Sequence, residues 1–247
     1  MAPLFEGLGG EPTVILCGAS VFLIASHYQG SAGFLRTLVG ATFDQHPWAN
    51  TLGHFWWFGS SIVLYLVMPL LLALATKGSF NQRYGFQLGD WRAGLGITTL
   101  FLAIMLPATY VASKLPSFQG QYPLAGNGAY LVNVGGGKTQ VSWTLFMTYE
   151  AAYFSYFIAW EFLFRGWMVH GLTPRWGAGA AILAQVAPFA VMHLGKAELE
   201  AFGSIIAGVA LGILSIRTRS FYYGALIHGV VAVWMDWLSA KGPLLGS

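Results

Sequence analysis

The residues that could do chemistry stand out because the sequence around them is almost entirely apolar. Glu161 and Arg165 lie four residues apart within residues 160–166, WEFLFRG. On a helix this spacing puts both side chains on one face, with the glutamate before its cation, the more favourable order for an ion pair. A charge inside a bilayer costs about 3 kcal/mol or more, so such residues face the protein interior and mark function. The alternative is a structural ion pair that pins two helices.

Two histidines and two acids follow this pair in the last part of the chain. Glu200 lies seven residues after His193, and Asp236 lies two helical turns after His228 on the same face. A glutamate and a histidine can deprotonate a water for attack on a carbonyl, and a second histidine can donate to the oxyanion that forms. We therefore expect Glu161, His193 and His228 to meet in one site, with the other two acids as auxiliary carboxylates. For each histidine alone, the alternative is a hydrogen-bonded packing residue.

A metal site is weakly indicated. No His-Glu-x-x-His pattern or comparable close spacing is present, so a zinc site would have to be assembled from three helices. We expect no cofactor. Glu150 lies eleven residues before Glu161, nearly on the same face but about 16 Å away along a helix. This predicts a structural or access-path carboxylate.

Composition predicts the fold class. The chain of 247 residues is 56% hydrophobic and only 9% charged, whereas a soluble domain carries about 25% charged residues. We expect an all-α, polytopic membrane helical bundle whose surroundings are the lipid bilayer. A net charge of +3 is too small to predict nucleic-acid binding. The single cysteine, Cys17, excludes an intramolecular disulfide and is expected to be buried. Residues 1–12 lack the features of a signal peptide.

About seven stretches are long and apolar enough to be spans. Pro69 predicts a kink in the second, and Gly203, Gly208 and Gly212 predict close helix contacts along the sixth. The expected spans are residues 13–28, 54–76, 93–113, 143–170, 177–194, 202–216 and 221–239, with an interfacial segment at 29–50.

This division creates a conflict of height. The predicted fourth span ends at His170, nine residues after Glu161, whereas His193 lies sixteen residues after the start of the fifth. At about 1.5 Å per residue the two side chains would differ by about 10 Å in depth. Either the fifth helix starts deeper or tilts, or the turn at residues 171–179 re-enters the bundle.

The loops carry weaker signals. Residues 114–140 form a connection long enough to be functional or mobile. Its GGGK run at 135–138 lacks the spacing of a phosphate loop and predicts a flexible connector. Basic residues divide six against five between the two sides, and the shorter loops favour a cytoplasmic Arg83 loop with the N-terminus inside. The larger group is Lys77, Arg83, Arg92, Arg175, Arg217 and Arg219, and the smaller is Arg36, Lys114, Lys138, Lys196 and Lys241.

The motifs around Glu161 and Arg165, around Phe189 and His193, and at His228 resemble the CPBP family, the CAAX-protease and abortive-infection intramembrane proteases. The resemblance covers about residues 143–239. It implies a glutamate-activated water, polarised with the second-motif histidine, that cuts a peptide bond at the membrane. It also implies that the third-motif histidine holds the oxyanion.

Two positions depart from the family pattern. Trp160 stands where the first glutamate, the usual base, is expected, and Ala232 stands where an asparagine or aspartate is expected. The chain is also similar to a bacterial subgroup with a single glutamate in the first motif. That likeness rests on Lys196 and Glu200 after the second motif and on residues 235–236, Met-Asp, in the last span.

The resulting hypothesis is an intramembrane endopeptidase of the cell (plasma or inner) membrane that acts on a membrane-anchored protein or peptide. Residues 1–141 would supply N-terminal spans and residues 142–240 the core with the site. Two alternatives stay open. One is a catalytically silent scaffold, immunity or maturation protein, and the other is a small transporter or channel.

Overall fold

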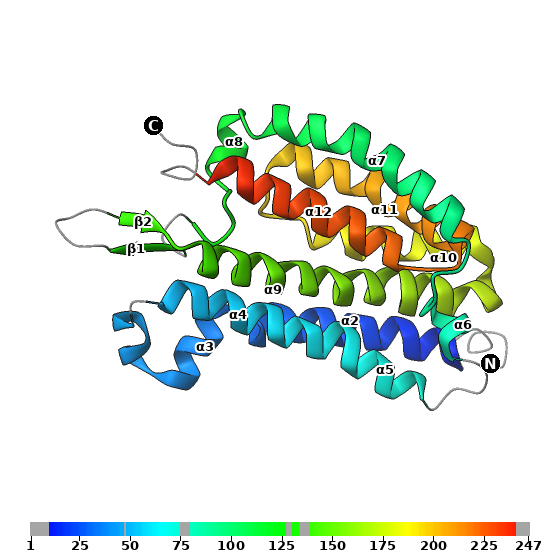
Figure 1. Ribbon diagram of the computed structural model, residues 1–247. Coiled ribbons are helices and arrows are strands. Elements are labelled where there is room, and N and C mark those ends of the chain that lie inside the picture. The colour runs from blue at the N-terminus through cyan, green and yellow to red at the C-terminus, as the bar shows by residue number, and fades with distance from the viewer. Residues whose placement is uncertain (1–9, 47, 75–79, 127–129, 134–138, 241–247) are drawn as a thin grey trace.

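Long helices running side by side make up nearly all of the chain that the computed structural model describes, residues 10–46, 48–74, 80–126, 130–133 and 139–240 (Figure 1). Four predictions concern residues outside these ranges: most of the N-terminal segment, the GGGK run, and the positions of Lys77 and Lys241. The elements are α2 (Glu11–Gln29), α3 (Ala32–Val39), η1 (Ala41–Gln45), α4 (Ala49–Ile62), η2 (Val63–Val67), α5 (Met68–Ala73), α6 (Phe80–Tyr84), α7 (Trp91–Ala112), α8 (Pro116–Gln119), β1 (Leu131–Asn133), β2 (Thr139–Val141), α9 (Trp143–Glu161), η4 (Phe162–His170), α10 (Gly171–Val191), α11 (Glu198–Thr218) and α12 (Tyr222–Ser239).

Four helices in the described ranges are long and apolar enough to cross a bilayer. They are α2, the combined α4–η2–α5 helix, α7 and α11. Among the other long helices, α9 lies between α4 on one side and α12 on the other (Figure 1). α12 also packs on α7, and α10 packs on α11. This arrangement confirms the all-α, polytopic helical bundle, to which the structure adds one short antiparallel hairpin, β1–β2.

The reversal between the fourth and fifth spans lies at Gly177. α9 continues through the π-helical segment η4 into the first turns of α10, and Pro174 lies inside this helix. Gly177 has φ 75° and ψ 160°, a conformation open essentially to glycine alone. The predicted end of the fourth span at His170 is therefore wrong, because the helix continues past Pro174 and ends at Gly177.

This shift removes the conflict of height. Glu161 lies sixteen residues before Gly177, and His193 lies sixteen residues after it. Two antiparallel helices that leave one turn and run for equal lengths bring the two residues to the same depth. The fifth helix needs no deeper start, no tilt and no re-entrant turn, because the fourth helix extends to Gly177.

The predicted close contacts along α11 are present at two of its three glycines. The π segment η2 ends two residues before Pro69, and the kink expected at this proline stays a prediction. On α11, a Cβ added at Gly208 would lie 3.4 Å from Phe189, and one added at Gly212 would lie 3.0 Å from Ile182. These two glycines let α11 approach α10, whereas a Cβ at Gly203 would meet nothing within 4 Å.

Two predictions about single residues are wrong. Cys17 is exposed on the surface of α2, so its thiol faces the surroundings of the bundle rather than its interior. The fourth span was predicted to end at His170. This residue is instead buried inside the bundle, with Nε2 2.9 Å from the Ser215 hydroxyl, because the helix continues past it.

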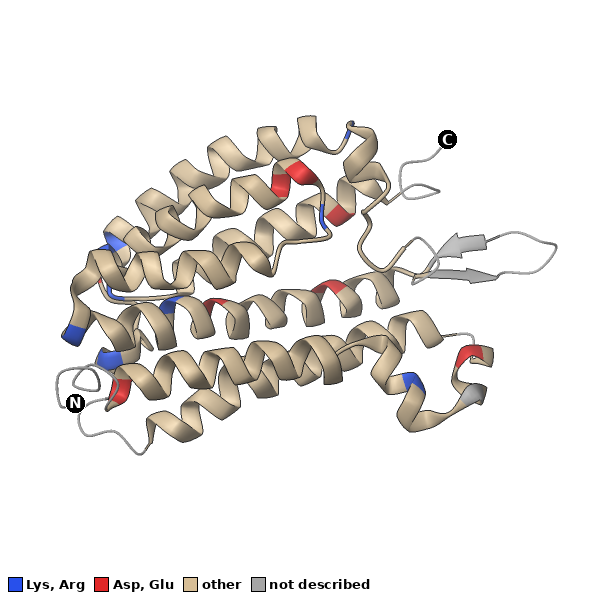
Figure 2. Cartoon of the chain, turned by 180° about the vertical axis from the view of Figure 1, so that it is seen from behind, with Lys and Arg blue, Asp and Glu red and all other residues tan. Residues whose placement is uncertain are grey.

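Apart from Lys77, which lies outside the described residues, the larger group of basic residues gathers at one end of the bundle, the end where the described chain begins (Figure 2). Arg217 pairs there with Asp90 at 2.8 Å, and Arg83 pairs with Glu11. Asp90 caps α7 by accepting from the Ala93 N–H, and this bond together with Arg217 lowers the pKa of its carboxyl. Which end faces the cytoplasm stays a prediction, as does the division at residue 141.

Replacing Gly177 tests whether this residue sets the depth of the site. Gly177→Ala keeps open space for the methyl group but forces a side chain into a conformation that costs about 1–3 kcal/mol. We expect a clear loss of stability in thermal unfolding of the detergent-solubilised protein, followed by tryptophan fluorescence. Gly179→Ala, two residues further on with equal open space, is the control and should be neutral or slightly stabilising. Equal transitions for both variants would show that Gly177 is not required.

Candidate active site

Glu161 lies at the centre of the bundle with no exposed surface and binds two partners through one oxygen. Its Oε1 accepts from Arg165 Nη1 at 2.9 Å and lies 3.0 Å from His228 Nδ1. A carboxylate can only accept, so Nδ1 of His228 carries the proton and its Nε2 is left for another partner. The predicted pair and the third-motif histidine are thus joined directly.

Gly224 explains how α12 comes this close to Glu161. A Cβ on Gly224 would lie 2.6 Å from Glu161 Oε2, closer than real Cβ contacts come. His228 follows one helical turn later on the same face. The glycine therefore admits the carboxylate, and the next turn supplies its imidazole partner.

His193 approaches from the end of α10. It is 5% exposed, and its Nδ1 lies 2.8 Å from the carbonyl oxygen of Phe189, one turn earlier. A carbonyl also only accepts, so Nδ1 carries the proton and Nε2 of the neutral ring is an acceptor. The rings of His193 and His228 are nearly parallel, with planes 12° apart and centroids 6.3 Å apart. The structure brings the four predicted residues together: Glu161, Arg165, His193 and His228.

Aromatic side chains surround these groups. Trp160 lies with its ring roughly perpendicular to both imidazoles, 5.9 Å from that of His193 and 6.3 Å from that of His228. Phe189 lies 4.7 Å from the His193 ring, and the Arg165 guanidinium lies 4.2 Å from the Phe189 ring. Such walls exclude water and strengthen every electrostatic interaction inside them. The residue that departs from the family pattern therefore belongs to the site itself.

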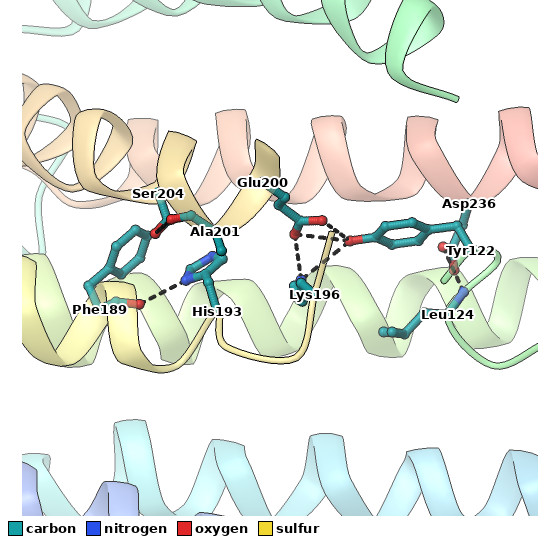
Figure 3. Close-up of polar contacts among 9 residues, drawn as sticks. All are labelled: Tyr122, Leu124, Phe189, His193, Lys196, Glu200, Ala201, Ser204 and Asp236. Atoms are coloured by element: carbon teal, nitrogen blue, oxygen red, sulfur yellow. Dashed lines mark hydrogen bonds and ion pairs between the residues drawn. The ribbon is translucent and has the colours of Figure 1, made fainter. Parts of the chain in front are cut away.

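Glu200 and Asp236 lie in a second polar cluster beside the first (Figure 3). Glu200 accepts from the Tyr122 hydroxyl at 2.8 and 3.0 Å and from Lys196 Nζ at 2.8 Å. Asp236 Oδ1 accepts from the Leu124 N–H at 2.9 Å. Burial, and then the negative charge of Glu200, raise the pKa of the Tyr122 hydroxyl well above its usual value. The two auxiliary carboxylates thus bond to a loop rather than to the two histidines.

Tyr122 and Leu124 are the contacts that sequence reasoning missed. Both belong to the long 114–140 connection, and only its length gave a signal. Glu150 is buried, and its carboxylate oxygens have no hydrogen-bond partner in the described part of the chain. Ala232 packs against the apolar core and offers no polar group. Within the described ranges no three His, Cys, Asp or Glu side chains could hold a metal ion, and the expectation of no cofactor stays a prediction.

Helices that can cross a bilayer, with a buried carboxylate, a buried guanidinium, one buried histidine and one partly buried histidine, define a polytopic membrane protein with a polar internal site. Residues 142–234 match the sequence model of the Rce1-like family, described as type II CAAX prenyl endopeptidase Rce1-like, so this part of the chain is similar to that family. The match agrees with the CPBP resemblance and supports a membrane peptidase in general. No curated protein and no solved structure matches the chain. The bacterial subgroup stays a prediction.

A double-mutant cycle measures how strongly the buried pair is coupled. Glu161→Gln leaves Arg165 buried without its counter-charge, which costs about 3–5 kcal/mol, whereas the double variant Glu161→Gln/Arg165→Met removes both charges and recovers much of the loss. The measurement is the free energy of unfolding from SDS titration in mixed micelles. The pair Lys196 and Glu200 has the same spacing but is partly exposed, and its cycle should give less than about 1 kcal/mol. Strict additivity for Glu161 and Arg165 would contradict the coupling.

Proposed function

We propose that the protein is an intramembrane endopeptidase that cleaves a membrane-anchored protein or peptide, and that it works as a multi-pass protein of the plasma or inner membrane. One observation carries the proposal: Glu161 holds His228 parallel to His193, with the ring centroids 6.3 Å apart. Two imidazoles at that separation are close enough to act on the same water and substrate carbonyl in the proposed reaction. The Rce1-like match supports the same class of reaction.

His193 is the base in this mechanism. Because its Nδ1–H is engaged by the Phe189 carbonyl, its Nε2 accepts a proton from water. The oxygen of that water forms a bond to the substrate carbonyl carbon, and the carbonyl oxygen takes the electron pair. His193 then returns the proton to the departing amide nitrogen, the C–N bond breaks, and an acid and an amine leave.

His228 and Glu161 stabilise the charge that develops. In its protonated form His228 donates from Nε2 to the oxyanion while Nδ1–H stays on the Glu161 carboxylate. This is the role of a buried carboxylate that orients an imidazole and stabilises its charged form. Arg165 holds Glu161 in place from the same helix. In this proposal Glu161 is a positioning group that acts on His228 through Oε1, while its Oε2 has no hydrogen-bond partner among the described residues.

The alternative of a catalytically silent scaffold rests on one observation. Trp160 fills space beside both imidazoles, and its indole N–H is buried without a hydrogen-bond partner among the described residues. A side chain of that size at the position of the family's base suits a site closed to substrate. Cleavage by the purified protein separates the two functions.

The first test is cleavage of a library of quenched fluorescent peptides that carry a membrane anchor, by the purified protein in proteoliposomes. We expect turnover by the wild type and a fall in kcat of about a hundredfold or more for His193→Ala and for His228→Ala. His170→Ala is the control, since this histidine bonds Ser215 outside the site, and it should cleave at the wild-type rate. Equal rates for wild type and all three variants would leave the scaffold as the function.

A second test moves the carboxylate without changing it. Gly224→Ala would place a methyl group 2.6 Å from Glu161 Oε2 and push the carboxylate away from His228. We expect kcat to fall at least tenfold while KM changes little, because positioning errors act on the chemical step. Gly203→Ala, a helical glycine with nothing within 4 Å, should match the wild type. A normal kcat for Gly224→Ala would contradict the role given to Glu161.

A further inference from the structure

Residues 121–126, with the sequence QYPLAG, form a non-helical segment that we call the strap. It follows α8 and lies against the bundle interior, where Tyr122 is 7% and Ala125 2% exposed. Backbone outside helices needs other partners for its polar groups when it is buried in a membrane protein. Side chains of α4 and α12 provide such partners for the strap, and a side chain of α11 binds the Tyr122 hydroxyl.

Two of these partners hold neighbouring backbone groups. Asp236 of α12 accepts from the Leu124 N–H at 2.9 Å, and the Asn50 side-chain amide of α4 donates to the Ala125 carbonyl. The His54 ring, one turn after Asn50, also contacts the Leu124 backbone. At the other end of the strap, Glu200 holds the Tyr122 hydroxyl. An acceptor for an N–H and a donor for the next C=O are the groups that bind any peptide backbone.

The groups that hold the strap have more bonding capacity than the strap uses. Asp236 is fully buried, and its Oδ2 has no hydrogen-bond partner in the described part of the chain. The same is true of both carboxylate oxygens of Glu150, which interacts electrostatically with Asp236. Unsatisfied buried acceptors mark places where another donor binds. The strap therefore occupies this region but leaves carboxylate oxygens of Asp236 and Glu150 without hydrogen-bond partners among the described residues.

The position of the strap connects it to the proposed catalytic groups. Figure 3 shows His193, Lys196, Glu200, Tyr122 and Asp236 in one row of polar side chains. His193 stands at one end of this row and the strap contacts at the other. The side chain of Leu124 packs between the apolar clusters of the bundle, so an aliphatic residue is accommodated there.

We propose that Asn50 and Asp236 form a subsite for the backbone of a substrate peptide, and that the strap occupies it until substrate takes its place. The class of ligand is an unstructured peptide segment with an aliphatic side chain at the position of Leu124. This inference rests on the proposed function for its biological role. The subsite itself is defined by the bonds to the strap.

The test compares two substitutions that should shift the affinity of one peptide probe in opposite directions. The probe is a fluorescein-labelled peptide with the sequence of the strap, Gln-Tyr-Pro-Leu-Ala-Gly, and the readout is fluorescence anisotropy with the full-length protein in detergent. Tyr122→Phe removes the bonds of the strap to Glu200 and Lys196 but leaves the subsite intact, so the probe should bind about tenfold tighter. In the Tyr122→Phe background, where the strap competes less, Asn50→Ala removes a donor that the probe needs, so the probe should bind several-fold more weakly than to Tyr122→Phe alone.

Matched controls separate these effects from general damage. Tyr110→Phe and Asn81→Ala are the same substitutions at exposed positions on other helices and should leave the affinity of the probe unchanged. If Asn50→Ala unfolds, Asn50→Asp replaces the donor by an acceptor of the same shape and should weaken binding as well. A probe whose aliphatic residue is replaced by aspartate should not bind.

The outcomes distinguish this inference from the proposed function. Shifts of the same sign for Tyr122→Phe and Asn50→Ala, no shift for either, or no binding of the probe to any variant would overturn the subsite. Cleavage of the anchored peptide library that neither variant alters would leave the peptidase standing and the subsite refuted. Opposite shifts in binding without any cleavage would support the subsite and refute the peptidase.

Discussion

The ion pair between Glu161 and Arg165 is the constraint on which the site depends. Both side chains are fully buried, and an isolated charge there would cost far more than the pair does. The pair also leaves Glu161 able to bind His228, because its Oε1 accepts from Arg165 at 2.9 Å and from His228 at 3.0 Å. A carboxylate neutralised by arginine and still available to an imidazole is stable enough to persist in an apolar interior. The position of His228 follows from that of Glu161.

Two glycines, Gly177 and Gly224, make this geometry possible. Gly177 turns the chain so that the two helices run equal lengths from the turn to Glu161 and His193, and Gly224 leaves room for the carboxylate against α12. Neither residue has a polar side chain, and neither touches a substrate in the proposed reaction. Helix packing of this kind converts backbone conformation into side-chain position, and an error of about 1 Å at a catalytic group is costly. The aromatic side chains around the site then hold the two imidazole rings in position.

Much of this could be predicted from the sequence, because it follows from local patterns. Composition and hydropathy predicted the helical membrane bundle, and the spacing of Glu161 and Arg165 predicted their pairing. The turn was misplaced because Pro174 is a stronger sequence signal than Gly177, while the conformation of a glycine is decided by tertiary packing. The contacts of Glu200 and Asp236 could not be predicted, because their partners Tyr122 and Leu124 lie more than seventy residues away in a loop without periodicity. The roles of the site residues stay predictions.

The two polar clusters divide the work of a membrane peptidase in a physically reasonable way. A peptide bond inside a bilayer must lose its existing hydrogen bonds before a water can attack it, and groups that bind backbone offset that loss. The cluster around Glu161 supplies charge stabilisation in the proposed reaction, and Glu161 Oε2 and Arg165 Nε and Nη2 have no hydrogen-bond partner among the described residues. Asn50 and Asp236 have the complementary chemistry, an amide donor and a carboxylate acceptor set for neighbouring backbone groups. Without a bound peptide, the Asp236 carboxylate and the Asn50 amide would lack these hydrogen-bond partners. The strap supplies the partners from the same chain.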